Sequence, residues 1–241
     1  MADATKRTRS DYYTAIADKC LETFDQEAAY WMPVLSGRGD PIYADATVKL
    51  ARLWLQALIP TLPDIGGDAN PFMREFLRSA RYLALFKAVE AAGRSPAEAG
   101  KVVYDAILLY SSSPTPLVPP PLDSPSEELH RRNRELAERS QARAFPGDYV
   151  YAYVAGDGVE FDFGYDFTEC ASHKLYREHH ALAFLPYFCF TDFALSRLAG
   201  HGLSRARSLS EGHGMCNHRM KQGRTVEPPW PPAFLTPDPR M

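Results

Sequence analysis

Three short pairs in the last third of the chain combine residue types that can do chemistry. Each joins a cysteine to an ionisable partner: Cys170 with His173, Cys189 with Asp192, and Cys216 with His218. The first two pairs are spaced i,i+3, which places both side chains on one side of a helix, and the third is spaced i,i+2, as on one side of a strand. Converging thiols, imidazoles and a carboxylate predict nucleophilic catalysis or metal binding.

Each of these residues also has a simpler structural interpretation. Free cysteine is among the most buried residue types, so Cys216 can be a small core side chain. Asp192 can face water or cap a neighbouring element, and His173 can be a surface histidine. Functional roles are favoured by Gly212 and Gly214, which let backbone amides approach a ligand closely, and by the cost of burying an unpaired carboxylate.

Composition narrows the function classes. The chain has 241 residues, 45% of them hydrophobic and 24% charged, with a net charge of −3, as in ordinary globular proteins. We therefore expect no nucleic-acid partner and no membrane partner, and no apolar run approaches the ~20 residues of a membrane helix. Residues 1–7 lack the apolar core of a secretory signal, so we expect reduced thiols in a cytoplasmic protein. The oligomeric state stays open, a homodimer included.

The first half of the chain is predicted to be helical. Apolar spacing and Pro and Ser signals indicate helices near residues 12–24, 48–58, 70–93 and 95–110, with Ser95 as an N-cap. Six prolines then predict an extended linker over 111–126. A charged helix is expected over 127–142.

The second half is predicted to be α+β. Alternating residues indicate strands over 148–154 and 159–167 with a turn at 156–158, then helices over 169–180 and 186–198, then a second hairpin of 203–209 and 215–221. This ββααββ order predicts a four-stranded antiparallel sheet with helices on one face. The expected regions are a helical region (1–110), the linker (111–126), an α+β domain with the site (127–227) and a Pro-rich tail (228–241).

Residues 161–221, about a quarter of the chain, resemble the L-2-amino-thiazoline-4-carboxylic acid hydrolase family. The similarity is carried by Cys170, by Cys189-Phe190-Thr191-Asp192-Phe193, by Gly202 with Arg205, and by the run from Leu209-Ser210-Glu211-Gly212 through Cys216-Asn217-His218-Arg219. The chain departs from the family pattern in three places. Asn217 replaces the usual Asp, His218 the usual Phe, and His213 the second glycine of a pair.

The resemblance implies ring opening of a cyclic amidine by water, through attack of a cysteine thiolate on the electrophilic ring carbon. It implies Cys216 as nucleophile, with Cys170 and Cys189 as alternatives, His218 or His173 as acid and base, and Asp192 as orienting residue or amine contact. Arginine has the fork geometry that binds carboxylates, which makes Arg219 and Arg205 candidate substrate contacts. Asn217 and His213 complete the predicted substrate-binding set.

The leading interpretation is thus a cytoplasmic hydrolase of a small heterocyclic, amino-acid-like substrate, with no cofactor and no metal. The change at Asn217 also permits a different ring-forming or ring-modifying enzyme of a biosynthetic pathway. A third interpretation is a sensor without catalysis, in which Zn²⁺ is bound by Cys170, His173, Cys189 and Cys216 or His218. A degenerate family member that only scaffolds partners is the fourth.

Overall fold

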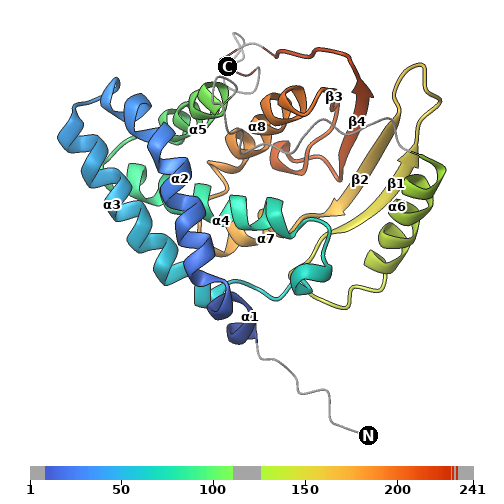
Figure 1. The fold of residues 1–241 in the computed structure, drawn as a ribbon, viewed down its shortest axis with the longest axis horizontal. Helices are drawn as coiled ribbons and strands as arrows, with labels where there is room; N and C mark the ends of the chain where they lie inside the picture. The colour runs from blue at the N-terminus through green and yellow to red at the C-terminus, as the bar shows by residue number, and fades with distance from the viewer. Residues whose placement is uncertain (1–8, 111–125, 229, 231, 233–241) are drawn as a thin grey trace, which may run out of the picture.

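The computed structural model describes residues 9–110, 126–228, 230 and 232. The predicted linker, apart from Ser126, and most of the predicted tail therefore lie outside the described residues. The described chain forms helices in its first half and a mixed unit of strands and helices in its second half (Figure 1).

Five helices make up the first half: α1 (Arg9–Ala15), α2 (Ala17–Ser36), α3 (Pro41–Leu58), α4 (Met73–Ala91) and α5 (Pro96–Tyr110). The helix expected near 48–58 begins earlier, because Asp40 caps it by accepting a 2.7 Å hydrogen bond from the Tyr43 amide. The predicted cap at Ser95 is confirmed: its hydroxyl accepts from the Glu98 amide, while the Glu98 carboxylate accepts from the Ser95 amide. None of the helices in the described ranges has the length and apolar character needed to span a membrane.

The predicted four-stranded antiparallel sheet is confirmed. Its strands are β1 (Val150–Ala155), β2 (Phe163–Glu169), β3 (His201–Ser204) and β4 (Cys216–Gln222), in the order β1-β2-β4-β3. The chain passes from β2 through α7 (Ala171–Glu178) and α8 (Leu185–Leu198) to β3, and α6 (Glu127–Ser140) lies beside β1 (Figure 1). The α+β fold with the order ββααββ follows from the sequence pattern.

Two strand boundaries differ from the prediction by four residues or more. Strand β2 begins at Phe163, because the Asp157 carboxylate accepts the amides of Val159 and Glu160 at 2.8 Å and holds them in a turn. Strand β3 is short and ends at Ser204. The expected strand over 203–209 is therefore wrong beyond that residue.

The early end of β3 has a local cause in Asn217. Its side-chain oxygen accepts hydrogen bonds from the backbone amides of Ala206 and Arg207, at 3.0 and 2.7 Å. These amides are consequently taken up by a side chain instead of a strand ladder. The chain from Arg205 to Ser208 runs as a loop whose first residue enters the interior.

The helical half packs directly on the α+β unit. One continuous cluster of buried side chains runs from Tyr13 to Cys216. Helix α4 contacts α3, α5 and α7, and α5 contacts α8. The α5–α8 approach is close, since a Cβ atom at Gly100 would lie 2.6 Å from the Tyr187 side chain. Side chains of α4 can therefore reach the surroundings of α8.

A buried ion pair joins α2 to α4. Arg81 donates two hydrogen bonds to the Glu27 carboxylate, at 2.7 and 2.8 Å, and both side chains are less than one-tenth exposed (8% and 7%). This fork geometry satisfies both groups away from water. It fixes α4 against α2, and so fixes the side chains that α4 presents on its other side.

Candidate functional site

Asp192 of α8 is the centre of a charged cluster. Its Oδ2 atom lies 3.0 Å from Arg205 Nη1 and 3.6 Å from His218 Nε2, and its Oδ1 atom lies 3.7 Å from Arg78 Nη2. These partners come from the loop after β3, from β4 and from α4. Four segments of the chain thus meet at one carboxylate.

The cluster keeps Asp192 ionised. Burial acts to raise the pKa of this carboxyl, but the nearby imidazole of His218 and the charges of Arg205 and Arg78 outweigh burial and lower the pKa below its ordinary value. About a quarter of the side chain (26%) is accessible. The carboxylate is therefore charged at neutral pH and partly exposed.

Arg205 is locked in place. Its Nη1 atom also donates to the carbonyl oxygen of Cys189 at 3.0 Å, its guanidinium lies over the ring of Phe193 at 5.1 Å, and its side chain is only 4% exposed. A cation this deeply buried needs a carboxylate partner, which Asp192 supplies. Arg205 therefore links α8 to the loop that follows β3.

The three C-terminal cysteines converge on this cluster. Cys170 precedes α7, Cys189 lies one turn before Asp192 on α8, and Cys216 opens β4. Negative charge on Cys216 or Asp192 raises the pKa of Cys170, and Cys170, Cys216 and Asp192 act in the same way on Cys189. The thiols therefore occupy one electrostatic neighbourhood, as their spacing suggested.

All three thiols are protonated in the resting site. Burial raises the pKa of Cys170 to about 12, against the opposing effect of the His173 and Ser172 amides at the start of α7. Burial raises the pKa of Cys189 well above its ordinary value, against the nearby charge of Arg205. A thiol in such surroundings needs a base to become a nucleophile.

Cys216 has the most support for a thiolate. Burial raises the pKa of Cys216, but the Leu209 amide, the Ser208 hydroxyl and the Arg205 charge all oppose that rise. The Leu209 N–H donates to Cys216 Sγ at 3.1 Å, and Ser208 Oγ lies 3.8 Å from the sulfur. A developing negative charge on this sulfur would be partly neutralised by groups already in place.

His218 has the position expected of a proton carrier. Its ring packs edge-on to Phe167, with centroids 5.5 Å apart, and its Nε2 atom faces Asp192 and lies 3.4 Å from Arg205 Nη1. Its Nδ1 atom is buried and has no hydrogen-bond partner among the described residues. One ring nitrogen of His218 is thus left without a protein partner in the described part of the chain, as a proton-carrying residue requires.

Four other predicted site residues lie outside this cluster. His173 is partly exposed on α7, where burial first and then the charge of Arg177 lower its pKa. His213 lies in the loop before β4, with Nδ1 3.2 Å from the Ser208 amide. The structure gives neither imidazole a contact with Asp192 or with a thiol in the described part of the chain.

Asn217 and Arg219 lie on the opposite face of β4 from His218. Asn217 holds the loop after β3, as described above. Arg219 donates to Asp166 at 2.7 Å across the β2–β4 pair and lies over the ring of Phe161. Arg219 thus has a structural partner on the outer face, and the structure gives the substrate role predicted for it no support.

Arg78 is the member of the site that the sequence analysis missed. It lies on α4, one turn before Arg81, in a helix that is buried at every position from Ser79 to Phe86. Arginines beside a fully buried helical run signal buried acidic partners. The partner of Arg78 is on α8, however, and no sequence spacing connects the two helices.

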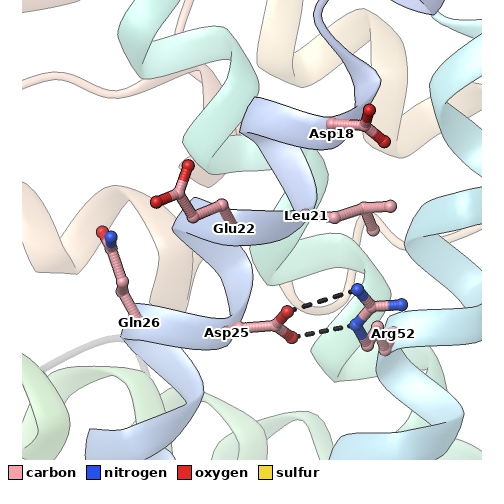
Figure 2. Close-up of a pocket in the computed structure, with 6 residues that line it drawn as sticks. All are labelled: Asp18, Leu21, Glu22, Asp25, Gln26 and Arg52. Carbon is pink, nitrogen blue, oxygen red and sulfur yellow. Dashed lines mark hydrogen bonds and ion pairs between the residues drawn. The ribbon is translucent and has the colours of Figure 1, made fainter.

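A surface hollow on the helical half is unrelated to this cluster. It lies on α2 and α3 and is lined by Asp18, Leu21, Glu22, Asp25, Gln26 and Arg52. Figure 2 shows that Arg52 reaches across it to bind Asp25, with hydrogen bonds of 2.9 and 3.2 Å. It offers no thiol or imidazole, and we do not assign it a catalytic role.

Neither a metal-binding group of the described side chains nor a similar known protein gives this chain a function. Among the described residues, no group of three or more His, Cys, Asp or Glu side chains is arranged to hold a metal ion. No family model, no curated protein and no solved structure matches this chain.

Proposed function

We propose that this protein is a hydrolase that opens the ring of a small heterocyclic, amino-acid-like substrate, such as a thiazoline or a related cyclic amidine, through a cysteine nucleophile. The observation that carries the proposal is the convergence of Cys170, Cys189 and Cys216 on a carboxylate held by Arg205 and His218. This arrangement offers a nucleophile, a proton carrier and positive charge within one partly accessible centre.

Cys216 is the proposed nucleophile. Its sulfur accepts a hydrogen bond from the Leu209 amide at 3.1 Å, whereas burial raises the pKa of Cys170 to about 12 in spite of the two amides beside it. Arg205 adds positive charge that lowers the pKa of Cys216. Both effects stabilise the thiolate that attacks, and both act again when the sulfur leaves at the end of the reaction.

His218 is the proposed acid and base. It accepts the thiol proton as the Cys216 sulfur bonds to the ring carbon between sulfur and nitrogen. When the tetrahedral adduct collapses, the ring carbon–sulfur bond breaks, and His218 returns the proton to the departing ring sulfur. Water then cleaves the bond between the enzyme sulfur and carbon, so the net reaction adds one water to the substrate.

Asp192 is proposed to orient His218 and to hold Arg205. Its carboxylate already faces two arginines and the imidazole of His218, at 3.0 to 3.7 Å, so it has little capacity left for a substrate amine. Its negative charge also favours the imidazolium that forms when His218 takes the proton. The carboxylate therefore acts through its neighbours.

Ring opening by single-cysteine variants tests the proposal. Cys216→Ser should reduce the turnover of 2-amino-thiazoline-4-carboxylic acid on the order of a thousandfold, because the hydroxyl that replaces the thiol is a far weaker nucleophile at neutral pH. Cys170→Ser and Cys189→Ser should have smaller effects. Cys20→Ala is the matched control, since Cys20 is a buried thiol of α2 in the helical core.

Release of the ring-opened thiol and the zinc content are measured on the same samples. Turnover that is equal in all four variants would exclude covalent catalysis by a cysteine. Stoichiometric zinc that is lost in the three site variants but kept in Cys20→Ala would identify the thiols as metal ligands instead.

A further inference from the structure

Arg78 has more hydrogen-bonding capacity than its partners use. Its Nη2 atom lies 3.7 Å from Asp192 Oδ1, at the outer limit of an ion pair. Its Nε atom is buried and has no hydrogen-bond partner among the described residues. A guanidinium has five N–H donors, and leaving buried donors unpaired is costly.

The guanidinium is nevertheless held firmly. It lies over the ring of Phe188 of α8, 5.8 Å from the centroid, and the side chain is only 16% exposed. Burial acts to lower the pKa of Arg78, but the charge of Glu75 and the weaker effects of Tyr82, Asp192 and Glu27 raise it above its ordinary value. Arg78 is therefore a permanent, pre-positioned cation beside Asp192, the carboxylate on which the thiols converge.

Arg205, the other guanidinium of the site, is already occupied. Its Nη1 atom serves Asp192 and the Cys189 carbonyl, and its side chain is almost inaccessible. Glu75 lies one turn before Arg78 on α4, but the structure places no oxygen of Glu75 within ion-pair distance of it. Arg78 is thus the cation of the site with unused donors.

We propose that Arg78 binds the carboxylate of the substrate and thereby holds the substrate's ring against the cysteines. A carboxylate fits because it can accept two hydrogen bonds from the fork of an arginine side chain. This inference rests on the proposed function for the identity of the substrate. The helical half of the chain then contributes directly to binding through α4.

The charge preference of cysteine alkylation tests this inference without any turnover assay. Iodoacetate carries a carboxylate and iodoacetamide is its neutral analogue, so the ratio of their rates at one thiol reports local recognition of the carboxylate. The ratio is measured by mass spectrometry at Cys170 and Cys189, which are partly accessible. Each ratio of the iodoacetate rate to the iodoacetamide rate is divided by the ratio measured for the same cysteine in the urea-unfolded chain.

For the wild-type protein we expect a normalised ratio above one at one or both thiols. Arg78→Gln should lower it on the order of tenfold, since hydrogen bonds to charged groups are the stronger ones. Arg78→Lys keeps the charge but not the fork, and should give an intermediate ratio. Arg74→Gln, the same change at an exposed position one turn earlier on α4, should leave it unchanged.

A wild-type ratio at or below one at both thiols would overturn the inference, and so would equal effects of Arg78→Gln and Arg74→Gln. The wild-type comparison needs no variant, so it decides the matter even if Arg78→Gln does not fold. A different result would be expected if the hydrolase proposal failed. The ratio would then depend on Arg78 as expected, while thiazoline acids would not be turned over.

Discussion

Asp192→Ala should lower the free energy of unfolding by about 3 kcal/mol, because it removes the carboxylate from a buried ion pair and leaves Arg205 uncompensated. Arg205 is 4% exposed, and the Cys189 carbonyl would be its remaining oxygen partner among the contacts described above. Urea denaturation followed by circular dichroism measures the loss. The same variant should nearly abolish ring opening, since His218 would lose its orienting partner.

The variant should also make the site cysteines more reactive toward a neutral alkylating agent. Asp192 raises the pKa of Cys170, Cys189 and Cys216, so its removal increases the fraction of thiolate. Asp166→Ala is the matched control, because it leaves Arg219 without its carboxylate on the outer face of the sheet, and Arg219 is 23% exposed against 4% for Arg205. Its cost should stay below about 1 kcal/mol. Equal costs for the two variants would contradict the account of the cluster.

The contribution of Asp192 to stability should depend on pH in one direction. Its pKa is lowered in the folded protein from an ordinary value of 3.8, so the folded state favours the charged form. The stabilisation is therefore complete above about pH 4 and is lost as the pH falls through the folded pKa. The difference in stability between the wild type and Asp192→Ala should be constant near neutral pH and shrink in acid.

Arg81→Met should destabilise the protein by about 3–5 kcal/mol, because it leaves the Glu27 carboxylate buried without its cation. The pair is bidentate, with distances of 2.7 and 2.8 Å, and joins α2 to the helix that carries Arg78. Replacing both partners by apolar residues, as in Glu27→Leu with Arg81→Met, should recover much of the loss. Urea denaturation of the single and double variants measures both effects.

Arg52→Met supplies the comparison for this prediction. Arg52 makes a similar two-bonded contact with Asp25, but that pair is exposed in the open hollow shown in Figure 2 (38% and 51%). Its loss should cost less than about 1 kcal/mol, because solvent screens exposed charges. If Arg81→Met cost no more than Arg52→Met, burial would not be what makes the Glu27–Arg81 pair important.

Local sequence signals predicted the type of each element where a capping residue or an alternating pattern determines the backbone structure. The cap at Ser95 and the alternating residues of β1 and β2 gave the correct element types. The second hairpin was only partly predictable. The amides of Ala206 and Arg207 donate to the side chain of Asn217, and the alternation of residue types does not predict these hydrogen bonds.

The site was also predictable only in part, because local spacing relates residues within one element and not between elements. Helical and strand spacing indicated that Cys189 and Asp192 share a face and that Cys216 and His218 share another, and the fold brings these faces together. Spacing within one element says nothing about a partner on a different one. Arg78 therefore escaped sequence reasoning, and Arg219, which pairs with Asp166, was predicted to have a role that its position does not support.

The most direct test of the proposed function is to look for the covalent intermediate. The wild-type protein and Cys216→Ser are mixed with 2-amino-thiazoline-4-carboxylic acid, quenched in acid within milliseconds to seconds, and analysed by intact-mass and peptide mass spectrometry. We predict a transient adduct of substrate mass on Cys216 of the wild type and none on the variant. Substrate that is hydrolysed without an adduct on any cysteine, at a rate unchanged in Cys216→Ser, would contradict a cysteine nucleophile.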